Sequence, residues 1–110
     1  MEHFDVSIKE YAWNDYEEIL NFVKGNPKTA LVFHETIFEM MKNLSAFPKL
    51  GRLVPDEELA ESGFRILSAG KYNIFYKIYG ESIRILRILH VSRDYITVLK
   101  KIDKEAEKID

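Results

Sequence analysis

FRILSAGKYNIFYKIYGESIRILRILHV, residues 64–91, consists of three strand-like runs joined by two short glycine turns. The runs are residues 64–69, 72–79 and 83–91, and the turns are Gly70-Lys71 and Gly80-Glu81. Short turns of this kind between consecutive strands predict an antiparallel meander. The last run is apolar on both faces, which is typical of a central strand covered on both sides.

Upstream of these runs the apolar period changes. Residues 3–11 alternate between apolar and polar side chains and predict a half-buried strand. Helical spacing follows and predicts a helix that begins at Asn14 or near Ala12. Gly25-Asn26-Pro27 ends this helix and begins a second one. Because the connection is so short, the two helices should form an antiparallel hairpin. The second helix has an apolar stripe made of Ala30, Phe33, Ile37, Met40, Met41 and Leu44.

The remaining segments complete the predicted topology. Residues 47–52 end the helical structure, residues 54–58 are expected to be an acidic loop or short turn, and a last helix should run from Tyr95 to about Glu107. The predicted order is β-α-α-β-β-β-α. Helices grouped before a meander favour the α+β class, with a helical hairpin packed on a mostly antiparallel sheet. A chain of 110 residues has room for one domain, spanning 1–110.

Several classes of protein are excluded by composition and motif. With no cysteine, the chain has no disulfide, zinc–thiolate site or thiol nucleophile. No phosphate-binding loop, HExxH or GxSxG motif occurs, and we expect neither a metal nor a cofactor. No apolar run approaches the roughly 18 residues of a membrane span, and the N-terminus lacks the regions of a signal peptide. We therefore expect a cytoplasmic protein without membrane contact.

The net charge of −2 conceals an uneven distribution. Residues 1–63 carry a charge of −6, residues 64–101 carry +6 and residues 102–110 carry −2. The C-terminal strands are therefore the candidate contact surface for an anionic partner. Their cationic or titratable residues are Arg65, Lys71, Lys77, Arg84, Arg87, His90 and Arg93.

Arg87 lies at an unusual position in this pattern. Strict alternation predicts one strand face with Arg84, Leu86, Ile88 and His90, and an opposite face with Ile83, Ile85, Arg87, Leu89 and Val91. Arg87 would then lie among aliphatic side chains, where an unpaired charge is costly. Two interpretations are open: an internal ion pair with Asp15 or Glu18, or a cationic cleft for an anionic partner.

His90 and Arg93 come together at the end of the last strand. An imidazole and a guanidinium could serve as acid/base and phosphate clamp in RNA cleavage, because the leaving oxygen needs a proton and the transition state needs charge neutralisation. The alternative is structural: a strand-end histidine bonded to a backbone carbonyl, with Arg93 and Asp94 shaping the turn.

Five segments occur in a fixed order along nearly the whole chain. They are Ala12-x-x-Asp15-Tyr16-x-x-Ile19, the stripe from Ala30 through Phe33 and Ile37 to Leu44 with its exit FPKLGR (47–52), Gly63-Phe64-Arg65, YNIFYKI (72–78) and ILRILHVSRD (85–94). In this order they resemble the RelE/ParE family of bacterial toxins from toxin–antitoxin operons.

The resemblance implies a fold and two possible mechanisms. RelE-like members cut mRNA in the ribosomal A site, whereas ParE-like members poison DNA gyrase without cleaving nucleic acid. The IFY and RILHxSRD segments are closer to the ParE side. A pI of about 5.9 also argues against docking on ribosomal RNA, where phosphate contacts dominate affinity.

We therefore expect the toxin of a type II toxin–antitoxin system, associated with plasmid stabilisation and growth arrest. It should inhibit gyrase by binding and be neutralised in a hetero-oligomer with a cognate antitoxin. The expected antitoxin- or target-binding residues are Arg65, Lys77, Arg84, Arg87 and Arg93.

Two alternatives remain. The first is a RelE-like, ribosome-dependent mRNA endonuclease with Arg65 and Arg87 on phosphate, His90 as acid/base and Arg93 beside it. The second is an inactive family member that only binds its antitoxin.

Overall fold

A computed structural model describes the backbone of residues 3–109 and the side chains of residues 3–104. Five strands form one sheet in the order β1-β5-β4-β3-β2, in which only the β1–β5 pair is parallel. The predicted α+β fold, a helical hairpin on a mostly antiparallel sheet, is confirmed. The elements are β1 (Asp5–Ile8), α1 (Glu10–Val23), α2 (Pro27–Ala46), β2 (Arg52–Leu53), α3 (Glu57–Glu61), β3 (Arg65–Ala69), β4 (Tyr72–Tyr79), β5 (Ser82–His90) and α4 (Ile96–Ile109).

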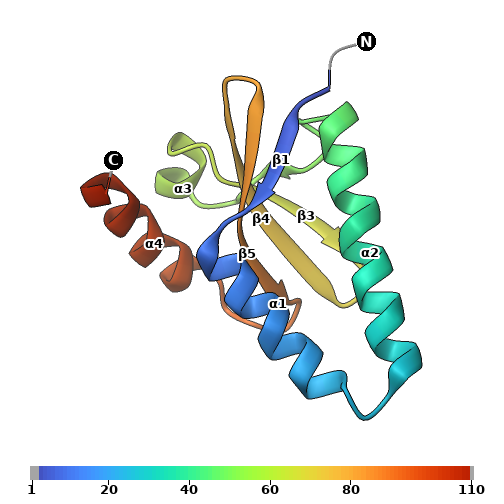
Figure 1. Ribbon diagram of the computed structural model, residues 1–110. Helices are drawn as coiled ribbons and strands as arrows, with labels where there is room; N and C mark the ends of the chain where they lie inside the picture. The colour runs from blue at the N-terminus through green and yellow to red at the C-terminus, as the bar shows by residue number, and fades with distance from the viewer. Residues whose placement is uncertain (1–2, 110) are drawn as a thin grey trace.

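Helices cover both faces of this sheet (Figure 1). The α1–α2 hairpin packs on one face, and its cluster includes Tyr16, Phe33, Leu44 and Tyr76. On the other face α3 and α4 pack over a cluster made of Val54, Leu59, Phe64, Ile66, Phe75, Leu89 and Leu99. Because β5 contributes side chains to both clusters, its predicted role as a central strand is confirmed.

Helix α2 begins where the sequence predicts, whereas helix α1 begins earlier than predicted. Asn26 caps α2 by accepting the Thr29 N–H at 3.2 Å, and Pro27 occupies the first turn. Helix α1 begins at Glu10, after an extended Lys9, so Asn14 lies inside the helix rather than at its cap. The predicted strand of residues 3–11 is accordingly too long, since the helical spacing of buried side chains already begins at Ala12.

A β-bulge in β5 overturns the predicted assignment of its two faces. Tyr76 pairs with Ile85 while Phe75 pairs with Arg87, so Leu86 has no partner in β4. The extra residue shifts the alternation by one position. As a result Ile88 joins Ile83 and Ile85 in the cluster under the hairpin, and Leu89 packs with Leu86 on the opposite side.

The exit from α2 is built around Gly51. The Tyr76 hydroxyl donates to the Pro48 carbonyl at 2.7 Å and accepts the Gly51 N–H at 2.9 Å. Burial raises the pKa of Tyr76, which outweighs the opposing effects of the Gly51 bond and of the nearby Arg65. These bonds place residues 52–53 beside β3 as strand β2, which the sequence pattern did not predict.

Two further boundaries differ from the prediction. Residues 57–61, which begin inside the expected acidic loop of residues 54–58, form the short helix α3, because Asp56 accepts the Leu59 N–H at 3.1 Å and Leu59 is buried. Helix α4 begins at Ile96 rather than Tyr95 and extends to Ile109.

Replacing Gly51 with alanine should destabilise the fold. A Cβ at this position would lie 2.7 Å from the Ile66 carbonyl oxygen and 2.8 Å from the Tyr76 hydroxyl. We expect Gly51→Ala to lower the free energy of unfolding by about 1–3 kcal/mol, as overpacking does, in urea titrations. Gly25→Ala is the control, because nothing lies within 4 Å of its added Cβ. Equal stability of the two variants would contradict this account.

Candidate functional site

Arg87 forms an internal ion pair with Asp15. Its Nε and one terminal nitrogen lie 2.6 and 2.8 Å from the two carboxylate oxygens, and the side chains are 14% and 5% exposed. Of the two carboxylates that the sequence offered, the partner is Asp15, and Glu18 is exposed. The bidentate geometry holds the guanidinium firmly against α1.

The same carboxylate also completes the edge of β5. Pairing with β1 ends where the Lys9 N–H bonds the Ile85 carbonyl. Farther along β5, Asp15 accepts the Ile88 N–H at 2.9 Å. A single side chain of α1 therefore replaces β1 as the hydrogen-bond partner of this strand.

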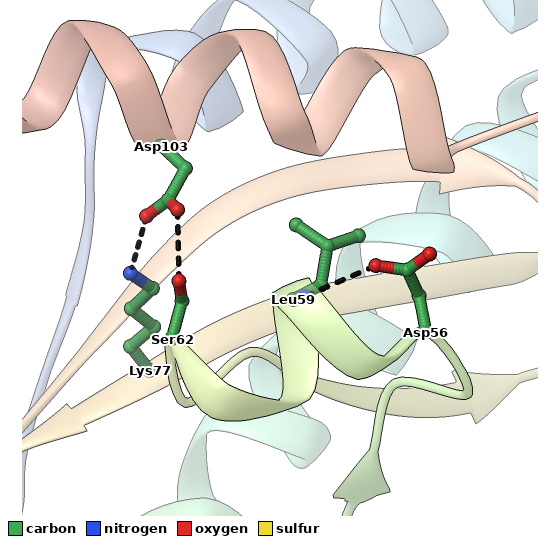
Figure 2. Close-up of polar contacts among 5 residues, drawn as sticks. All are labelled: Asp56, Leu59, Ser62, Lys77 and Asp103. Atoms are coloured by element: carbon green, nitrogen blue, oxygen red, sulfur yellow. Dashed lines mark hydrogen bonds and ion pairs between the residues drawn. The ribbon is translucent and has the colours of Figure 1, made fainter.

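Lys77 is held on the opposite side of the sheet, against α4 (Figure 2). Its Nζ lies 3.0 Å from Asp103, whose other oxygen accepts the Ser62 hydroxyl at 2.8 Å. The Lys77 ammonium also lies 4.3 Å from the centre of the Phe64 ring. Nearby, Lys100 pairs with Asp56 and Glu58, and these contacts, led by the hydrogen bond that Lys100 donates to Glu58, raise the Lys100 pKa.

The role of Asp103 was not predicted from the sequence. The sequence feature that could have indicated this role is the position of Asp103 next to the buried Ile102 of α4, because a partly buried carboxylate requires a partner. Asp103 thus joins α3, β4 and α4 through Ser62 and Lys77.

Arg65 and Arg84 contact different parts of the molecule and do not form one shared binding site. Arg65 donates to the Gly51 carbonyl at 2.6 Å. The guanidinium of Arg84 lies 4.0 Å from the centre of the Tyr79 ring. Neither guanidinium has a carboxylate partner among the residues whose side chains are described.

His90 and Arg93 do lie together at the end of β5. The His90 Nδ1 accepts the Ser92 N–H at 3.1 Å and lies 2.8 Å from the Ser92 hydroxyl, so the predicted bond from the ring to a backbone carbonyl is wrong. The Arg93 N–H bonds the His90 carbonyl at 3.0 Å and closes the turn. Both side chains are exposed.

Arg65, Arg87 and His90 of the nuclease hypothesis do not converge on one point. Arg65 pairs with Tyr76, and His90 pairs with Tyr72. These positions are four residues apart along β4, or about 13 Å at the rise of a strand. Arg65 is directed to Gly51, and Arg87 to Asp15.

A groove of about 650 Å³ lies beside His90, between α2 and the β3–β4 turn. It is mostly apolar, and two lysines, Lys28 and Lys71, also line it. Its apolar and aromatic lining includes Phe22, Val32, Phe33 and Tyr72. Among the described side chains no cluster of three potential metal ligands occurs, and no described helix is long and apolar enough to cross a membrane.

Comparison with known proteins decides the family. The sequence model of the ParE toxin of the type II toxin–antitoxin system parDE matches residues 6–95. The chain belongs to the ParE toxin family. Helix α4 lies beyond the matched residues.

Two solved structures are similar to this ParE toxin. A chromosomal ParDE toxin–antitoxin system from P. aeruginosa has a TM-score of 0.63 at 25% identity, covering 81% of this chain and 97% of the other. The toxin–antitoxin complex RelBE2 from Mycobacterium tuberculosis has a TM-score of 0.59 at 24% identity, covering 80% and 98%. No curated protein matches the chain.

Removing the Asp15 carboxylate should be costly. Asp15→Ala leaves the Arg87 charge and the Ile88 N–H without partners, and we expect a loss of about 3 kcal/mol in the free energy of unfolding. Adding Arg87→Met should restore part of it. Glu18→Ala, at an exposed position of the same helix, should change stability little. An Asp15→Ala variant as stable as Glu18→Ala would refute the proposed role.

The Asp103 contacts should hold α4 on the sheet. Asp103→Ala leaves Lys77 unpaired at 12% exposure, and we expect about 1–3 kcal/mol lower stability. Amide exchange should accelerate most in α4, since its polar anchor is lost. The control is Lys101→Ala, an exposed side chain of the same helix; uniform acceleration over all elements would argue against a local anchor.

Proposed function

We propose that this ParE toxin inhibits DNA gyrase by binding it, without cleaving nucleic acid, and that a cognate antitoxin neutralises it. The proposal rests first on the family, whose ParE-like members are expected to act on gyrase. The two similar solved structures come from toxin–antitoxin systems, which supports an antitoxin partner.

The main structural support is the separate engagement of the cations. Phosphate cleavage requires cationic groups and a proton donor aimed at one point. Here the Arg87 guanidinium is bound by Asp15 and Arg65 by a backbone carbonyl. The β4 partners of His90 and Arg65 are four residues apart along that strand. Such an arrangement favours a binding surface over a nuclease centre.

The same contacts narrow the set of residues available to a partner. Lys77 and Arg87 already have carboxylate partners within the chain, so they serve the fold. Arg84 and Arg93 have none among the described side chains, and we infer that they carry the target contact. The mostly apolar groove beside His90, with Lys28 and Lys71 in its lining, fits an amphipathic antitoxin segment with acidic side chains.

A supercoiling assay with purified gyrase and relaxed plasmid tests this proposal. The toxin should inhibit supercoiling and accumulate cleaved plasmid, whereas mRNA on translating ribosomes should stay intact. The double variant Arg84→Glu/Arg93→Glu should lose inhibition by tenfold or more, about the 1.4 kcal/mol of one charged contact or above.

Two controls separate the alternatives. Lys101→Glu reverses an exposed charge on α4 and should leave inhibition unchanged. His90→Ala should keep growth arrest in cells, because no proton transfer is required. Cleaved mRNA together with loss of arrest in His90→Ala would overturn the proposal in favour of the endonuclease. Overexpression without arrest would favour a member that only binds its antitoxin.

A further inference from the structure

Strand β1 leaves one edge of the sheet open. It is the first strand in the sheet order, and Figure 1 shows it flanked by α2 with no other element laid over it. Asp5 and Lys9 donate their N–H groups to Glu81 and Ile85 of the β4–β5 hairpin. Because backbone groups alternate in direction along a strand, those of Val6 and Ile8 point away from β5.

The outward groups at Phe4 are already used. Its N–H bonds the Ser45 carbonyl at 2.9 Å, and its carbonyl accepts the Ser45 hydroxyl at 2.7 Å. Among the described residues no hydrogen bond engages the outward N–H groups of Val6 and Ile8. Buried edges of this kind are normally paired, and exposed ones are templates for another strand.

The sequence of the edge is self-complementary. Residues 5–9, Asp-Val-Ser-Ile-Lys, carry opposite charges at the two ends and apolar side chains on either side of a central serine. When two copies run antiparallel with Ser7 opposite Ser7, Asp5 of each copy lies opposite Lys9 of the other. The side chains of residues 5, 7 and 9 are exposed on one face, so both ion pairs form on that face.

The free backbone groups select the same register. With Ser7 at the centre, Val6 of one copy faces Ile8 of the other, and these are the residues whose N–H and carbonyl groups point outward. A register centred on Val6 would require Phe4, whose groups Ser45 already binds. A register centred on Ile8 would require Glu10, which is the first residue of α1.

We propose that this protein forms a twofold dimer through antiparallel pairing of β1 with β1 of a second copy, joining two sheets into one. The twofold axis passes beside Ser7, and each dimer contains two Asp5–Lys9 ion pairs. This inference does not depend on gyrase as the target.

Charge reversal provides a test that preserves the monomer. Asp5→Lys and Lys9→Asp each place like charges opposite one another twice in the dimer. Each should weaken dimerisation by tenfold or more in sedimentation equilibrium, because like charges directly opposite are destabilising. Lys9→Asp should still fold, since aspartate is a preferred residue at this N-cap position of α1.

Two combinations make the test specific. The double variant Asp5→Lys/Lys9→Asp should regain the wild-type dimer, and an equimolar mixture of the two single variants should form a heterodimer. Lys42→Asp on α2 is the matched control and should dimerise like the wild type. Amide exchange at Val6 and Ile8 should slow with rising protein concentration, whereas exchange at Phe4 should not change.

Three results would overturn the proposal. They are a wild-type chain that stays monomeric at all attainable concentrations, a dimer unaffected by both single reversals, and single variants that do not form a heterodimer when mixed. A β1 edge that gains protection only when the antitoxin is added would instead assign the edge to the antitoxin.

Discussion

The Asp15 carboxylate is the contact on which the arrangement of this protein depends. It binds the Arg87 guanidinium and the Ile88 N–H together, directly after the bulge at Leu86. Helix α1 is thereby fixed against the edge of β5, and α2 follows through a short turn. The groove beside His90 is lined on one side by that hairpin. Burying both charges is tolerable because every carboxylate oxygen has a donor.

Much of this fold could be predicted because its signals are local. Periodicity and glycine turns identify the meander and the hairpin, and Asn26-Pro27 identifies the start of α2. The bulge could not be predicted, since ILRIL offers no local sign of an extra residue. Strand β2 is only two residues long and exists because Tyr76 positions Gly51. Helix α3 depends on the burial of Leu59 under α4, which is a tertiary effect.

The candidate site likewise has some features that the sequence predicts and others that depend on tertiary contacts. The sequence identifies the basic residues and names Asp15 as a possible partner of Arg87. It cannot show which charges remain available, because their partners are distant along the chain: Asp103 is 26 residues from Lys77, and Gly51 is 14 residues from Arg65. A formal count of +6 therefore overstates the charge that the strands present to a partner.

The parallel pairing of the first and fifth strands has a consequence for synthesis of the chain. Asp15 leaves the ribosome 72 residues before Arg87, an interval of roughly 4–14 s at translation rates of about 5–20 residues per second. During that time the hairpin has no completed sheet to cover, and contacts of such long sequence separation also form slowly. The sheet, and with it the surface formed by its strands, is therefore completed only near the end of translation.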